Sequence, residues 1–295
     1  MKNNYGVTKR SIIFGIGPAL LLYVGFVIIP ILISIYYAFF SWDGLTAMKF
    51  VGFSNFKAIL ADKYFLRTVA NTIIVVFSMV LIQLPLAFLI AIVVNEINKL
   101  AKIYRTLIFI PVTISAVVTS LIWNKIYNLN YGLLNTLLCR LGLESWAHNW
   151  LGDTNIAIFA VCIAIVWQGV GLYMVMYLAG LQSVSTEIVE AAIVDGASRF
   201  KRITRVIVPL LKPTIVVTVI YSISNSFRVF DLIYTMTKGG PNHSTEVMTI
   251  YMYQNSFVNS KFGYGSAVSI LILLFSFLAI KGVTRLLEGK GGEDE

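Results

Sequence analysis

Five long stretches of this sequence contain no aspartate, glutamate, lysine or arginine. A helix needs about 20 residues to cross the hydrocarbon core of a membrane, so such stretches constrain the fold strongly. Backbone groups inside lipid have to be hydrogen-bonded within the protein, which predicts helices. Strands of a membrane barrel would instead alternate apolar and polar residues over about ten positions. The charge-free stretches are 11–42, 68–95, 106–124, 154–186 and 262–280.

A sixth apolar segment, near 216–237, contains Arg228 and Asp231. Charged residues make up 13% of the chain, about half the share found in soluble domains. The first stretch follows Lys9 and Arg10 as a signal peptide would, but it is too long for one, and no small-residue cleavage site follows it. We therefore expect an all-α, polytopic fold with residues 1–295 as one transmembrane domain. The expected spans are 11–42, 68–95, 105–127, 154–184, 214–237 and 262–284.

The orientation is predicted from lysine and arginine near the ends of the spans. With the N-terminus in the cytoplasm, fourteen basic residues lie inside and eight outside. This bias predicts that both termini are cytoplasmic, and it accounts for the net charge of +9. The basic residues are spread over separate segments and form no single stripe, so we expect no nucleic-acid partner.

The sequence shows no machinery for energy conversion. It has no P-loop pattern, and the two cysteines and two histidines form no cluster, so no metal site is expected. A membrane-embedded enzyme would need a nucleophile–base or metal cluster, which the spans do not offer. An ion-coupled carrier or a channel acting alone is the alternative, but it would need a relay of ionisable residues, and Asp231 is the only acidic residue in the spans.

The longest interior segment predicted to be cytoplasmic, 187–212, mixes small and charged residues. Glu190, Ala191 and Ala192 favour a helix, and Gly196 follows where that helix would end and turn. A basic helix resumes over 197–208. This pattern indicates a helix–turn–helix that docks into a groove of a soluble protein. An ordinary interfacial loop with amphipathic ends is the alternative.

The same stretch, EAAIVDGASRFKRITRVIVPLLKP, resembles the EAA loop of permease subunits in binding-protein-dependent ABC importers. Two further blocks, FVGFSNFKAIL and RVFDLIYTMTKGGPNHSTEVMTIYMYQNSF, resemble the carbohydrate-uptake branch of that family, which includes maltose, glycerol-phosphate and oligosaccharide permeases. The positions that match the EAA loop pattern are Glu190, Ala191, Ala192, Asp195, Gly196, Ala197, Pro209 and Pro213.

The resemblance implies a permease of the bacterial cell membrane that forms half of the translocation path for a sugar or oligosaccharide. It implies four kinds of partner: a second homologous permease, an ATPase dimer, an extracellular or periplasmic sugar-binding protein, and the sugar itself. The chain would be no enzyme and would bind no cofactor, because the ATPase uses ATP and magnesium. Residues 187–205, between spans four and five, would form the coupling helix. This helix would be seated in a cleft of the ATPase.

A transported sugar needs hydroxyl and amide partners near the middle of the membrane. Ser222, Asn225, Ser226 and Val229 recur at helical spacing, which predicts one polar face. For each serine or threonine the alternative is a hydrogen bond between helices or within its own helix. Arg228 and Asp231 are expected to pair along the helix, or else to contact substrate. The predicted substrate path comprises Thr113, Ser115, Gln168, Gly169, Tyr173, Ser222, Asn225, Ser226, Arg228 and Asp231.

Overall fold

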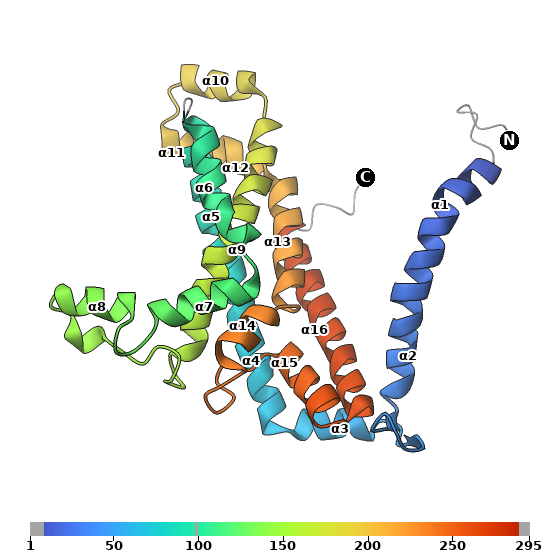
Figure 1. The fold of residues 1–295 in the computed structure, drawn as a ribbon. Coiled ribbons are helices and arrows are strands. Elements are labelled where there is room, and N and C mark those ends of the chain that lie inside the picture. Colours follow the sequence, from blue (N-terminus) through green and yellow to red (C-terminus); the bar gives the residue numbers. More distant parts are fainter. Residues whose placement is uncertain (1–8, 98–99, 289–295) are drawn as a thin grey trace. The chain divides into compact units, whose positions relative to one another are not determined.

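The computed structural model describes residues 9–97 and 100–288, and most of them are helical (Figure 1). In these ranges the strands are limited to a short antiparallel pair, β1 (Phe40–Ser41) and β2 (Lys49–Phe50). The chain divides into two compact units: residues up to 62 with 252–273, and residues 63–251 with the chain from 274 onward. The polar C-terminal sequence GKGGEDE, and Lys2 and Lys99 of the charge count, lie outside the described residues.

The first unit begins with a helical stretch made of α1 (Lys9–Tyr23), the π-helical η1 (Val24–Ile28) and α2 (Ile29–Tyr37). The hairpin of β1 and β2 follows, then α3 (Ser54–Ala61). Later in the chain, η5 (Gln254–Val258) and the first half of α16 (Phe262–Glu288) complete this unit.

A close approach between α16 and the hairpin shapes the first unit. A Cβ on Gly263 would lie 1.9 Å from the carbonyl oxygen of Phe40, so only glycine permits this contact. The ring of Trp42 packs beside it, with its centroid 4.6 Å from that of Tyr37 and 5.8 Å from that of Phe262.

The second unit is built around α9 (Ala157–Gln182), most of whose residues are buried. A continuous helical stretch packs against it, formed by α4 (Lys63–Phe77), η2 (Ser78–Gln83) and α5 (Leu84–Glu96). On α9, Gly171 lies against the backbone of Ile108, whose carbonyl oxygen a Cβ would approach to 2.4 Å. This glycine therefore lets α6 (Ala101–Thr113) approach α9 closely.

Two predicted spans are broken. Between α6 and α7 (Ala116–Ile126) the chain bends by 98°, because Ile114 and Ser115 are extended. The basic helical turns α11 (Arg199–Arg202), η4 (Ile203–Ile207) and α12 (Val208–Leu210) meet α13 (Lys212–Ser226) at 72°.

The predicted ranges 105–127 and 214–237 are therefore not single helices. Within 214–237, α13 ends at Ser226 and α14 (Asp231–Thr237) begins after a gap of four residues. The remaining helices are α8 (Leu133–Arg140), η3 (Glu144–Trp146), α10 (Thr186–Val194) and α15 (Met248–Tyr253).

Four helical stretches are long and apolar enough to cross a membrane, and the two bent pairs raise the number to as many as six. The prediction of an all-α, polytopic membrane fold is confirmed. Which residues of each helix lie within the bilayer stays a prediction. The four stretches are Phe14–Tyr37, Lys63–Glu96, Ala157–Gln182 and Phe262–Leu287.

Candidate functional site

A cavity of about 220 Å³, the inner cavity, lies in the second unit among η2, α6, α9 and α13. It brings together four of the residues predicted for the substrate path, from two different helices. It also contains Met79 and Gln83, which the sequence reasoning did not select. The lining residues are Met79, Gln83, Val112, Ile165, Gln168, Gly169, Leu172, Tyr173 and Asn225.

Gln83 is fully buried, and its amide fixes one wall of the cavity. Its Nε2 donates hydrogen bonds to the carbonyl oxygens of Ile165 and Val166, at 3.1 and 3.2 Å. A Cβ on Gly169 would come within 2.6 Å of that nitrogen, so the glycine makes room for the amide. Oε1 of Gln83 has no hydrogen-bond partner among the described residues. A buried acceptor of this kind is suited to a ligand hydroxyl.

Gln168 links the cavity to the break between α6 and α7. Its Nε2 donates to the carbonyl oxygen of Ile114 at 2.9 Å, and this carbonyl belongs to the extended residues of the bend. Ser115 caps α7 by accepting a hydrogen bond from the backbone nitrogen of Val118, and Thr113 donates to the carbonyl oxygen of Ile110. Thr113 and Ser115 thus make the local hydrogen bonds that were the alternative to substrate contact, and neither lines the cavity.

The face of α13 contributes Asn225 to the cavity, and Tyr173 of α9 lies opposite with its hydroxyl beside Ser222 and Asn225. Ser226 is buried and donates to the carbonyl oxygen of Ser222 at 2.8 Å and to the sulfur of Met79 at 3.1 Å. Ser222 and Ser226 therefore lie behind the cavity wall. Because α13 ends at Ser226, Val229 does not extend the predicted polar face.

Arg228 and Asp231 are exposed, one after the end of α13 and the other at the start of α14. The predicted helical pairing fails, because the intervening residues are not helical. The described residues contain no ion pair between these two side chains. Neither residue lines the cavity.

The inner cavity is suited to a neutral ligand, because its surface is mainly apolar and carries a few polar groups that orient a ligand. Its polar lining consists of three amides and one phenol, with no Asp, Glu, His, Lys or Arg. Amides offer both donors and acceptors, which matches the pattern of a sugar hydroxyl. In the described ranges no cluster of His, Cys, Asp and Glu could hold a metal ion.

The predicted helix–turn–helix is confirmed in structure. Ser185 caps α10, and Gly196 follows its end with a φ of +75°, a left-handed conformation that favours glycine. The backbone nitrogens of Gly196 and Ala197 donate back into α10, as in a Schellman end. Ser198 then caps α11.

This segment presents apolar side chains to solvent. Val194 is 88% exposed and Phe200 is 75% exposed, one on each side of the turn. Isolated exposed apolar residues are common, but a pair flanking a tight turn provides an anchor for a groove. The segment is also tied to the membrane helices, because the guanidinium of Arg199 donates two hydrogen bonds to the carboxylate of Glu96 at the end of α5.

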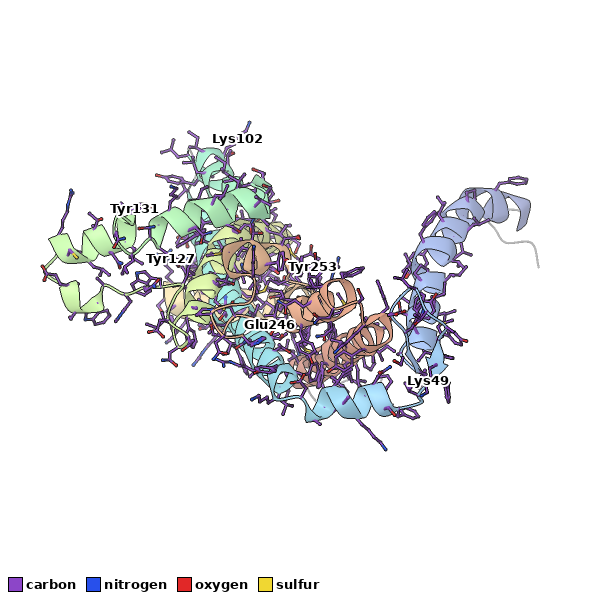
Figure 2. The ribbon with its side chains drawn as sticks, turned by 60° about the horizontal axis from the view of Figure 1, so that its bottom comes forward. Lys49, Lys102, Tyr127, Tyr131, Glu246 and Tyr253 are labelled. Carbon is purple, nitrogen blue, oxygen red and sulfur yellow. The ribbon has the colours of Figure 1, made fainter. Side chains whose placement is uncertain are left out.

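The loop after α14 is more ordered than its glycines suggest. Glu246, labelled in Figure 2, is 1% exposed, and its carboxylate lies within hydrogen-bond distance of Nδ1 of His243. The side-chain amide of Asn71 on α4 donates to the carbonyl oxygens of both residues, at 3.1 and 2.8 Å. The ring of Tyr64 stacks near His243, 4.3 Å between centroids. His243 is therefore half-buried and held by its neighbours.

Comparison with known proteins gives a family. Residues 65–290 match the model described as "Binding-protein-dependent transport system inner membrane component". A probable ABC transporter permease protein of Pyrococcus horikoshii is 33% identical over 265 residues, covering 89% of this chain and 90% of its own. The multiple sugar-binding transport system permease protein MsmF of Streptococcus mutans is 32% identical, covering 90% of this chain and 91% of its own.

A third relative is the trehalose/maltose transport system permease protein MalF of Thermococcus litoralis, which is 35% identical and covers 78% of each chain. Among solved structures, a chain of a bacterial ABC transporter involved in the import of alginate superposes with a TM-score of 0.79. It is 22% identical, covers 92% of each chain and shows a shared fold.

Proposed function

Since this chain belongs to the family of binding-protein-dependent transport system inner membrane components, we propose that its inner cavity passes a sugar or oligosaccharide through the membrane. The chain is a membrane permease subunit of an ABC importer. The single observation that carries the sugar assignment is the cavity, which joins Gln83, Gln168, Tyr173 and Asn225 without a charged side chain. The relatives named for multiple sugars and for trehalose and maltose support it.

The chain supplies one half of the path, and a second homologous permease supplies the other. A binding protein delivers the sugar from outside the cell, and both termini of this chain lie in the cytoplasm. A pair of ATPase subunits hydrolyses ATP with magnesium. The segment 187–205 meets these subunits, with Val194 and Phe200 as apolar anchors. Its tie to α5 through Arg199 and Glu96 gives motion of the segment a direct mechanical route to the helical stretch that carries Gln83.

The path residues Thr113, Ser115, Arg228 and Asp231 stay in this proposal as groups that substrate meets in another state of the transport cycle. Ser222 and Ser226 act as support for the cavity wall. A carrier or channel acting alone gains no support, because the cavity offers no relay of acidic, basic or histidine side chains.

The proposal is tested with the full complex in proteoliposomes. The binding protein is loaded from a panel of labelled mono- and oligosaccharides, and uptake is measured with ATP inside. We expect saturable, ATP-dependent uptake of at least one saccharide and no response to a proton or sodium gradient. Gradient-driven uptake without ATP would instead favour an ion-coupled carrier, and transport of only non-saccharide solutes would remove the sugar assignment.

A further inference from the structure

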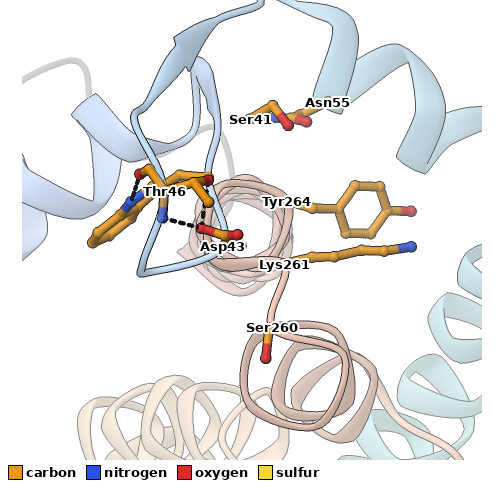
Figure 3. Close-up of a pocket in the computed structure, with 8 residues that line it drawn as sticks. Ser41, Asp43, Thr46, Asn55, Ser260, Lys261 and Tyr264 are labelled. Carbon is orange, nitrogen blue, oxygen red and sulfur yellow. Dashed lines mark hydrogen bonds between the residues drawn. The ribbon is translucent and has the colours of Figure 1, made fainter.

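The first unit contains a cavity of its own, the polar cavity, with a volume of about 280 Å³. It lies where α2 has ended and α16 begins, and these helices belong to two of the stretches able to span a membrane. The cavity is therefore placed at the level of a membrane–water interface, where lipid headgroups lie. Its polar and aromatic lining includes Ser41, Trp42, Asp43, Asn55, Lys261 and Tyr264 (Figure 3).

Asp43 supplies a fixed negative charge. Its Oδ1 accepts hydrogen bonds from the backbone nitrogens of Leu45 and Thr46 and from the hydroxyl of Thr46, at 3.0, 2.8 and 2.9 Å. The indole of Trp42 donates to the carbonyl oxygen of Thr46 and closes the loop. These bonds, the backbone bond from Thr46 first, lower the pKa of Asp43 to about 2. Oδ2 accepts none of these three bonds.

Lys261 supplies a positive charge to the same cavity, and its side chain extends alongside Tyr264 (Figure 3). Within the described ranges, Asp43 and Lys261 form no ion pair with each other. Asn55 uses both hydrogens of Nδ2 on the carbonyl oxygens of Ala38 and Phe40, which leaves Oδ1 as an acceptor. One cavity thus holds two opposite charges that are not neutralised by each other.

An apolar groove of about 170 Å³ lies between α2 and the first half of α16, the same two helices. It begins within about two turns of the polar cavity along each helix. The hydroxyl of Ser269 donates hydrogen bonds to the carbonyl oxygen of Gly265 and to the sulfur of Met252, so it does not require a polar ligand. The groove is lined mainly by Pro30, Ile31, Ile35, Ile270 and Leu273.

We propose that the polar cavity and the apolar groove together bind one phospholipid with a primary ammonium headgroup, of the phosphatidylethanolamine type. The ammonium meets Asp43 and Asn55, the phosphate meets Lys261 and Ser41, and one acyl chain lies in the groove between α2 and α16. A saccharide would fill the polar cavity but would leave the groove empty and would not need both charges. This inference rests on the membrane location of the chain and not on the identity of the transported solute.

The test uses the assembled transporter, purified in mild detergent and incubated with equimolar phosphatidylethanolamine, phosphatidylglycerol and phosphatidylcholine carrying distinct isotopic labels. Native mass spectrometry reports which lipid is retained. We expect phosphatidylethanolamine to be retained, because phosphatidylglycerol lacks the ammonium and phosphatidylcholine lacks its N–H donors. Retention is expected to hold from pH 8 to pH 5: the pKa of Asp43 is lowered, so its charge is lost only as the pH falls below the ordinary value of 3.8 toward 2.

Three variants assign the contacts. Asp43→Asn keeps an Oδ1 acceptor for the loop but removes the charge, and we expect retention to fall about tenfold or more, as for loss of a charge-assisted hydrogen bond. Lys261→Gln should act similarly, and Leu273→Trp should obstruct the groove. Lys57→Gln is the matched control, because Lys57 is exposed on α3 and lines neither cavity nor groove. Equal thermal unfolding of all variants shows that folding is not the cause.

Several results overturn the proposal. Equal retention of phosphatidylglycerol, or unchanged retention in Asp43→Asn, removes the headgroup assignment. If soluble phosphoethanolamine, which has no acyl chain, binds with the same affinity as phosphatidylethanolamine, the groove does not bind an acyl chain. Displacement of the lipid by an oligosaccharide assigns the cavity to saccharide. Absence of any retained lipid in the complex, together with crosslinks from this face to the second permease, makes the face a subunit interface.

Discussion

Asn225 is the side chain on α13 that faces the inner cavity with both a donor and an acceptor. We expect Asn225→Leu to slow uptake by about 5- to 150-fold, because losing a buried hydrogen-bond partner costs about 1–3 kcal/mol. Uptake of labelled sugar by the reconstituted complex, normalised to receptor-stimulated ATP hydrolysis, measures the effect. A leucine is favourable in a membrane-spanning helix, so assembly of the complex should change little.

The matched control is Asn155→Leu, because Asn155 is exposed near the start of α9 and lines no part of the cavity. Ser120, in the same charge-free stretch as Thr113 and Ser115, would be an unsuitable control. It is fully buried and bonded to the carbonyl oxygens of Ala116 and Leu232, so a leucine there would overpack the contact between α7 and α14. Equal uptake by Asn225→Leu and Asn155→Leu would move the path away from this wall.

Gly169 and Gln83 form a second testable pair. Gly169→Ala places a Cβ 2.6 Å from Nε2 of Gln83, whose amide is held by Ile165 and Val166. We expect this change to lower stability by about 1–3 kcal/mol, as overpacking does. In a Gln83→Ala background the same alanine should cost much less, so the two effects should not add. Thermal unfolding of the four proteins measures the coupling, and simple additivity would contradict it.

Three of the four polar side chains that line the inner cavity were predicted from the sequence, but Gln83 was not selected. Gln168, Tyr173 and Asn225 were selected because a transported sugar needs hydroxyl and amide partners near the middle of the membrane. Gly169 was selected with Gln168 and Tyr173 on the same span. Gln83 offered the same signal, an amide within the charge-free stretch 68–95, two residues before Pro85. Its contact with Gly169 depends on the packing of η2 on α9, and residue spacing within one span does not reveal it.

The turn after α10 was correctly predicted, because a glycine soon after a helix-forming run signals a left-handed end. The helix breaks were missed for a physical reason. Apolar residues continue through Ile114 and Phe227. Hydropathy therefore predicts one span at each place where the backbone forms two helices. The capping of the first break comes from Gln168 on another helix, which local sequence does not show.

Gly196→Leu and Glu190→Lys should each uncouple ATP hydrolysis from transport. For Gly196 the cost is in the backbone, about 1–2 kcal/mol for a left-handed residue, because a Cβ there meets nothing within 4 Å in this chain. The leucine side chain would instead project toward the ATPase. For Glu190, charge reversal is expected to cost several kcal/mol against a basic partner.

Gly196→Asn is the matched control for the turn, because asparagine tolerates the left-handed region better than leucine does. We expect it to retain most of the coupling. The measurements are ATP hydrolysis stimulated by the loaded binding protein and uptake in the same vesicles. Normal stimulation and normal uptake in both Gly196→Leu and Glu190→Lys would contradict the docking role of 187–205.

The chain exposes apolar surfaces that require lipid or partner proteins to cover them. The stretch Phe14–Tyr37 is apolar, and none of its most hydrophobic window is buried within the chain. Val194 and Phe200 are exposed on the segment proposed to meet the ATPase. Lipid is a suitable cover for the first of these surfaces, but exposed apolar side chains beside the turn after α10 favour a protein partner.

We therefore expect no ATP-dependent uptake by this chain alone. It has no P-loop pattern of its own. In our proposal the segment 187–205 attaches this chain to an ATPase, and a second permease completes the path beside the inner cavity. Liposomes with this chain alone, with the ATPase added, and with both permeases and the ATPase form the comparison, each with the loaded binding protein outside. Uptake should appear only in the third. Robust uptake by the lone subunit would show that one chain encloses the whole path and would return the channel or carrier alternative to first place.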